Sequence, residues 1–178
     1  GQVIHAVKSG LDPLGSSTGS AVAVAAGIVP MAVGTDTSHS ITACAMGNGI
    51  CGLKPPAGVL SQEGIIPISK TFDSAGAMAQ NVSDTLKLYS AMRDEPLPEI
   101  TQTPAGKLRI SVNIANADMN PQEIRKYLDG VIETLRNNGV VISEVHQPPT
   151  PELPSIMKRE FGTGLEAYLI KSGAKLKT

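Results

Sequence analysis

The pattern of apolar and polar positions predicts a short helix and a strand near the start of the chain. Residues 21–26 are an unbroken run of Ala and Val, and Gly27 and Pro30 follow, so we expect a small-residue helix that ends there. Residues 31–33 are apolar and predict a short strand that breaks into a polar turn at residues 34–40. Hydroxyl-rich loops therefore lie before the helix and after the strand.

Farther along, the pattern predicts a second helix among loops and short strands. Asn81 and the polar residues after it predict the cap of an amphipathic helix that continues to Met92. The Gly/Ala-rich residues 43–58 predict tightly packed loops with one short strand at residues 50–53. Further loops with short strands are expected at residues 59–68 and 71–76.

The C-terminal half predicts a strand, a helix and a second strand. We expect strands at residues 108–112 and 140–145, and between them a helix with Pro121 in its first turn and Gly139 after its end. This order is typical of a βαβ unit, which implies a parallel or mixed sheet covered by helices. The helix carries apolar residues at helical spacing, which we expect to be buried: Ile124, Tyr127, Leu128, Val131, Ile132 and Leu135.

Two Pro-rich stretches interrupt these periodic patterns. Residues 94–106 show no periodicity and are the best candidate for a boundary within the chain. Residues 147–154 precede a final helix, expected from about Ser155 to Ile170.

Composition and charge narrow the classes of partner. A formal charge of −1 and a pI near 6.3 indicate no excess of positive charge that would attract nucleic acid or an anionic membrane, so we expect neither partner. No apolar run approaches the roughly 20 residues of a membrane span, and we expect a cytoplasmic protein. Cys44 and Cys51 have no companions at zinc-ligand spacing, so we expect reduced thiols, no metal and no cofactor.

The candidate chemistry lies in the two hydroxyl-rich loops. A serine hydroxyl needs a neighbouring group to take its proton during attack on a carbonyl, and backbone donors must stabilise the oxyanion that forms. The first loop reads Gly-Ser-Ser-Thr-Gly-Ser at residues 15–20, and the second reads Gly-Thr-Asp-Thr-Ser-His-Ser at residues 34–40. Three further stretches follow: Cys-Gly-Leu-Lys-Pro at 51–55, Gly-Ile-Ile-Pro at 64–67 and Phe-Asp-Ser-Ala-Gly at 72–76.

This arrangement resembles the amidase signature family. The family pattern is a Gly-Gly-Ser-Ser-Gly-Gly-Ser loop followed, one helix and one strand later, by Gly-Thr-Asp-x-Gly-Gly-Ser-Ile-Arg, and the three later stretches resemble its next landmarks. Carried over by position, the resemblance makes Ser40 the nucleophile and Ser16 the bridging serine, usually held by a cis peptide. The backbone amides from Thr37 through Ser38 and His39 to Ser40 would form the oxyanion hole, with Ser17 and Asp36 in support.

The resemblance also implies a fold and an activity. The fold would be α/β, with a mixed, partly parallel central sheet flanked by helices, and residues 1–178 would be the central part of one such domain, truncated at both ends. The activity would be hydrolysis of the C–N bond of a small carboxamide through a serine acyl-enzyme. Complementary missing segments or a homo-oligomer are the implied protein partners.

Several residues depart from the family pattern. Ser38 and His39 replace two glycines before the nucleophile, which we expect to crowd the oxyanion hole. Thr42 replaces the arginine that pairs with the aspartate, so Asp36 is expected to lack a partner. The family's catalytic lysine lies on an earlier strand, and Lys8, the lysine upstream of Ser16, does not match its motif. We therefore expect this chain alone to be impaired.

Other interpretations stay open at this point. Residues 15–19 also fit Gly-x-Ser-x-Gly, which would make Ser17 a nucleophile with His146 as a possible base, although Pro13 disfavours the buried strand that such an elbow needs. The same loop could bind an anion or only cap a helix. His39 is either a base for Ser40 or a local turn residue, and Lys54 is expected to be structural. At the level of the whole protein, the alternatives are a degenerate amidase-fold binding or interaction module and an amidotransferase subunit.

Overall fold

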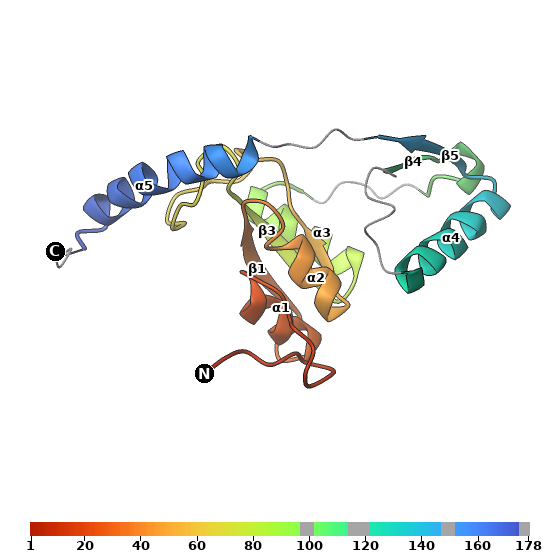
Figure 1. The fold of residues 1–178 in the computed structure, drawn as a ribbon, viewed down its shortest axis with the longest axis horizontal. Coiled ribbons are helices and arrows are strands. Elements are labelled where there is room, and N and C mark those ends of the chain that lie inside the picture. The colour runs from red at the N-terminus through yellow and green to blue at the C-terminus, as the bar shows by residue number, and fades with distance from the viewer. Residues whose placement is uncertain (97–101, 114–121, 147–151, 175–178) are drawn as a thin grey trace. The chain divides into compact units, whose positions relative to one another are not determined.

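The computed structural model describes residues 1–96, 102–113, 122–146 and 152–174, apart from the side chains of residues 123 and 124 (Figure 1). The chain divides into two compact units, one formed by residues 1–98 with 152–178 and the other by residues 99–151. The first division lies inside the Pro-rich stretch 94–106. The expected helix start at Pro121 lies outside the described residues, as do residues 147–151 of the second Pro-rich stretch.

The first unit is built on a three-stranded sheet in the order β1–β3–β2. Strand β1 is Met31–Asp36, β2 is Cys51–Leu53 and β3 is Ser74–Ala79, and both pairings are antiparallel. Strand β3 is the central one and is buried along most of its length, since it has a neighbour on each side. The two edge strands end at Asp36 and Leu53, and the segments that follow them carry Ser40 and Lys54.

The described residues of this unit form four helices: α1 is Thr18–Ala25, α2 is Thr42–Asn48, α3 is Val82–Arg93 and α5 is Leu153–Lys171. The predicted helices at α1, α3 and α5 are confirmed. Asn81 caps α3 as expected, because its side chain accepts a hydrogen bond of 2.9 Å from the Asp84 N–H. The core is formed by Ala21, Ile41, Cys44, Ala45 and Met78.

Helix α2 corrects the expectation of loops at residues 43–58. Its Gly- and Ala-rich sequence has no clear helical period, but Cys44 and Ala45 are buried in the core and Gly49 ends the helix in the left-handed conformation, with φ of 67°. The Asp36 carboxylate accepts hydrogen bonds from the N–H groups of Ile41 and Thr42 at its start. Tertiary contacts therefore form a helix that local pattern does not predict.

The second unit has the predicted βαβ order. Strands β4 (Arg109–Asn113) and β5 (Val141–Val145) pair in parallel, and α4 (Gln122–Asn137) connects them. A short 3₁₀ helix, Ala105–Lys107, precedes β4. Helices together with sheets of both pairing types confirm the α/β class.

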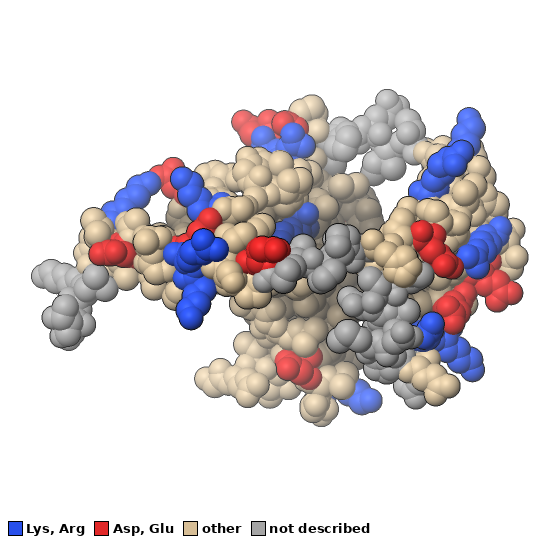
Figure 2. All heavy atoms as spheres, turned by 45° about the horizontal axis from the view of Figure 1, so that its top comes forward, with Lys and Arg blue, Asp and Glu red and all other residues tan. Residues whose placement is uncertain are grey.

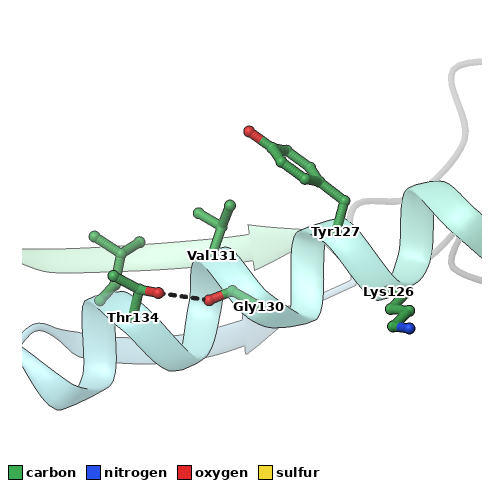
Figure 3. A pocket seen from close by; sticks show the side chains of 6 residues that line it. Lys126, Tyr127, Gly130, Val131 and Thr134 are labelled. Atoms are coloured by element: carbon green, nitrogen blue, oxygen red, sulfur yellow. Dashed lines mark hydrogen bonds between the residues drawn. The ribbon is translucent and has the colours of Figure 1, made fainter.

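Within this unit the expected burial of the α4 stripe is wrong for three residues, whereas Ile132 and Leu135 are half-buried. Tyr127 is 72% exposed, Leu128 43% and Val131 38%. Figure 3 shows Tyr127 and Val131 on one side of α4 and Lys126 on the other. The side chain of Ile124 lies outside the described residues. The described part of the unit offers two strands, which are too narrow a surface to cover the whole apolar face of a helix of this length.

Helix α5 is held to the loop before β3 by Glu160. Its carboxylate accepts hydrogen bonds from the hydroxyl groups of Ser69 (2.5 Å) and Thr71 (2.6 Å) and from the Thr71 N–H (3.0 Å). These hydrogen bonds lower the pKa of Glu160 from 4.5 to about 2, and the bond from the Ser69 hydroxyl has the largest effect. Near the end of the helix, Lys171 Nζ lies 2.7 Å from Glu63 Oε1. None of the helices in the described ranges is long and apolar enough to cross a membrane.

The lowered pKa makes the docking of α5 dependent on pH. Because the carboxylate form is favoured in the folded state, its contribution is complete above about pH 4.5 and is lost as the pH falls toward 2. We expect Glu160→Gln to increase hydrogen exchange of α5 amides at pH 7, with the difference from the unmodified chain shrinking between pH 4.5 and 3. Glu166→Gln, at an exposed position of the same helix, is the control. An equal difference at both ends of the pH range would contradict this assignment.

Charged side chains of both signs are interspersed over the face of the molecule in Figure 2. This distribution agrees with a formal net charge of −1. The expectation that nucleic acid is not a partner stays a prediction.

Candidate active site

The two serine loops lie against each other. The Ser17 N–H donates a hydrogen bond of 3.3 Å to the Ser40 carbonyl, which brings the first loop to the end of the second. The Ser17 hydroxyl donates to the Thr35 carbonyl at 2.9 Å and accepts from the Thr35 N–H at 3.1 Å. The peptide between Gly15 and Ser16 is cis, as the family resemblance implied. Ser16 is exposed and Ser40 is half-buried, so both serines reach the surface.

These contacts overturn the nucleophile-elbow interpretation of Ser17. An elbow requires a strand that runs directly into the serine, but residues 1–17 are all described and contain no strand. The Ser17 hydroxyl is engaged by β1 at both its donor and its acceptor positions. The helix-cap interpretation is also wrong, because Ser17 occupies the N-cap position of α1 without a side-chain capping bond. Ser17 instead fastens the first loop to β1.

Ile41, the residue after Ser40, is anchored on a floor of glycines. Its side chain is fully buried, and a Cβ atom built on Gly34, Gly52 or Gly76 would lie 2.7–3.1 Å from it. These glycines belong to all three strands of the sheet, and Gly34 pairs with Gly76 in the register of β1 and β3. The absence of side chains at these positions lets Ile41 approach the sheet, and this packing fixes the backbone that carries Ser40.

Asp36 stands at the start of the turn that leads to Ser40, and its side chain is fully buried. Its Oδ2 accepts hydrogen bonds from the N–H groups of Ile41 (2.7 Å) and Thr42 (3.3 Å). Its Oδ1 lies 3.0 Å from Lys54 Nζ. The expectation that Asp36 lacks a partner is therefore wrong, because Lys54, which follows β2, pairs with it.

A second buried carboxylate supports the same turn from behind. Asp73 Oδ1 accepts a hydrogen bond of 2.6 Å from the Thr37 hydroxyl. Its Oδ2 accepts from the N–H groups of Ile68 (2.8 Å) and Ser69 (3.0 Å). Asp73 is part of the Phe-Asp-Ser-Ala-Gly landmark, but no local pattern indicates these partners, and Thr37 lies 36 residues away along the chain. Asp73 joins the loop before β3 to the turn.

Three carbonyl groups of the turn accept hydrogen bonds, whereas a row of its N–H groups has no acceptor among the described residues. The carbonyls of Thr37, His39 and Ser40 accept from Lys54 Nζ, the Ala43 N–H and the Ser17 N–H, at 3.1, 2.7 and 3.3 Å. Within the described part of the chain, no group accepts a hydrogen bond from the N–H of Ser38, His39 or Ser40. Three consecutive donors next to a serine are suited to binding a negatively charged oxygen.

Two further predicted residues are placed by the structure. The His39 side chain is exposed, and its carbonyl, rather than its ring, makes the local contacts of the turn. Cys44 is buried behind the site, and desolvation raises the pKa of its thiol. Both Cys44 and Cys51 are free thiols, as expected.

Comparison with known proteins identifies the family. Residues 1–172 match the sequence profile described as Amidase. The chain belongs to the amidase family. Among amidase relatives, a glutamyl-tRNA(Gln) amidotransferase subunit from Lactobacillus delbrueckii subsp. bulgaricus is 35% identical over 175 residues, which cover 88% of this chain and 36% of that protein.

Solved amidase structures share the fold. A crystal structure of an amidase matches with a TM-score of 0.85 and 30% identity, covering 98% of this chain and 41% of that one. Native peptide amidase from Stenotrophomonas maltophilia matches with a TM-score of 0.80 and 30% identity, covering 100% of this chain and 41% of that one. This amidase chain therefore spans well under half the length of these relatives.

Proposed function

We propose that this chain carries the nucleophile and oxyanion hole of an enzyme that hydrolyses small carboxamides. The observation that carries the proposal is the row of N–H groups at Ser38, His39 and Ser40, next to the Ser40 hydroxyl and beside the Ser16 loop. Membership of the amidase family supports the same chemistry. The oxyanion-hole role of the Thr37 N–H stays a prediction from the family pattern.

In the proposed reaction, Ser40 Oγ forms a bond to the amide carbonyl carbon while its proton leaves through Ser16 to a base. The carbonyl oxygen becomes an oxyanion held by the turn N–H groups, each of which contributes on the order of 3 kcal/mol. The C–N bond then breaks, and the leaving nitrogen takes a proton and departs as ammonia or an amine. Water attacks the resulting ester, releases the carboxylic acid and returns a proton to Ser40.

No residue of this chain matches the base that this reaction scheme requires. The family pattern assigns it to a lysine on a strand before the first serine loop, whereas Lys8 is an exposed residue in a bend. Lys54 is not a substitute, because its ammonium group already donates to Asp36 and to the Thr37 carbonyl. We therefore expect residues 1–178 alone to hydrolyse amides slowly.

The test is release of ammonia or amine from a panel of simple carboxamides by the full gene product. We expect hydrolysis that depends on Ser40. The alternative, a degenerate relative that only binds small amides or partner proteins, predicts no release above background with any carboxamide. Hydrolysis that is unchanged by Ser40→Ala would overturn the assignment of the nucleophile.

A second candidate within the same family is one component of a glutamine-dependent amidotransferase. It is favoured by the relatives of 30–37% identity that are named as glutamyl-tRNA(Gln) amidotransferase subunits. In that case glutamine would be the preferred amide, and further proteins would co-purify with the full gene product. Efficient hydrolysis of other carboxamides by the isolated protein would favour the free amidase instead.

A further inference from the structure

Lys54 joins two parts of the turn that precedes Ser40. It follows β2, on the opposite side of β3 from β1, and its side chain is 25% exposed. Its Nζ lies 3.0 Å from Asp36 Oδ1 and donates a hydrogen bond of 3.1 Å to the Thr37 carbonyl. A single ammonium group thus contacts the last residue of β1 and the first peptide of the turn.

The contact with Thr37 determines the direction of a neighbouring donor. The carbonyl of Thr37 and the N–H of Ser38 belong to the same peptide group, which is trans, so they point in opposite directions. Because the carbonyl points toward Lys54, the Ser38 N–H points away from it. This N–H is the first of the three donors for which the described residues provide no acceptor.

The contact with Asp36 helps to fix the backbone at the other end of the turn. The buried Asp36 carboxylate receives the N–H groups of Ile41 and Thr42, which follow Ser40. A buried carboxylate that lost its cation would be strongly destabilised or neutralised, and those hydrogen bonds would weaken. Lys54 therefore holds the backbone on both sides of Ser40, directly at Thr37 and through Asp36 at Ile41.

We propose that Lys54 is a positioning residue of this active site: it orients the Thr37–Ser38 peptide so that the Ser38 N–H serves the oxyanion, and it compensates the charge of Asp36. The inference rests on the proposed function of the turn as an oxyanion hole. It gives Lys54 a role at Asp36 although the arginine that pairs with this aspartate in the family pattern is Thr42 here.

The test compares Lys54→Met and Lys54→Arg in the full gene product. We expect Lys54→Met to lower kcat by about 100-fold or more with little change in KM, which is the size of effect seen when one oxyanion donor is lost. Lys54→Arg, which keeps a charged donor, should retain kcat within about tenfold. Lys87→Met is the matched control, because Lys87 pairs with Asp84 on the surface of α3. It should leave kcat unchanged.

A second readout does not depend on catalysis. In protein labelled with ¹⁵N-serine, Lys54→Met should shift the Ser38 amide resonance, and Lys87→Met should not. Where Lys54→Met alone does not fold, Asp36→Asn/Lys54→Met removes the unpaired buried charge and should fold with the same low kcat and shifted resonance.

The outcomes separate the two proposals. An unchanged Ser38 resonance, or an unchanged kcat in folded Lys54→Met protein, would overturn the role of Lys54 while leaving the amidase proposal in place. Absence of Ser40-dependent hydrolysis together with a shifted Ser38 resonance would overturn the proposed function but keep Lys54 as the residue that orients this peptide.

Discussion

Replacing Ser40 with alanine is expected to lower kcat for amide hydrolysis by the full gene product by at least about 10⁴-fold, because loss of a serine nucleophile removes the covalent route entirely. The folded structure should be little changed, since Ser40 is half-buried and its backbone carbonyl, rather than its hydroxyl, holds the first loop through Ser17. The measurement is steady-state hydrolysis together with thermal unfolding of both proteins.

Ser17→Ala is the matched control for this prediction. The Ser17 hydroxyl bonds to the Thr35 carbonyl and N–H, so its removal should destabilise the fold by about 1–3 kcal/mol. The folded fraction should nevertheless keep kcat within about tenfold. If Ser17→Ala abolished hydrolysis in folded protein and Ser40→Ala did not, the roles of the two serines would have to be exchanged.

Replacing Gly76 with alanine is expected to cause the largest loss of stability in the sheet. A Cβ atom at this position would lie 2.1 Å from the Leu53 carbonyl oxygen and 2.7 Å from Ile41 Cδ1. The first neighbour is backbone of the adjacent strand, so it cannot move without disturbing the pairing of β2 with β3. We expect a loss of at least about 3 kcal/mol in the free energy of unfolding, measured by urea denaturation.

In the same unit, Gly19→Ala is expected to have the opposite effect on stability. Gly19 lies in the first turn of α1, and a Cβ atom there would have no neighbour within 4 Å. Alanine at this position should be neutral or stabilising by up to about 1 kcal/mol. A similar small effect for Gly76→Ala would contradict the account of Ile41 packed on a glycine floor.

The sequence predicted the elements whose signals are local. The helices α1, α3 and α5 are confirmed, together with the Asn81 cap of α3, and so is the order of strand, helix and strand in the second unit. The two serine loops could be recognised because a tight turn around a reacting serine requires small and hydroxyl-bearing residues at fixed positions. Recognition of the amidase family rested on the order and spacing of these loops.

Features that depend on contacts between distant segments could not be predicted. The pairing of Asp36 with Lys54 joins the ends of two edge strands across β3, and no local pattern indicates that these two residues meet. Helix α2 was not predicted for the same reason, because it is stabilised by burial of Cys44 and by the Asp36 carboxylate rather than by a helical period. In α4, periodicity predicted the apolar face correctly, but burial depends on what else packs against it.

The most direct test of the account is covalent labelling with a fluorophosphonate, followed by peptide mapping of the full gene product. If Ser40 is the nucleophile beside an oxyanion hole, the label should be found on Ser40 and should disappear in Ser40→Ala. Label on Ser17, or labelling that is unchanged in Ser40→Ala, would contradict the assignment of Ser40 as the reacting serine.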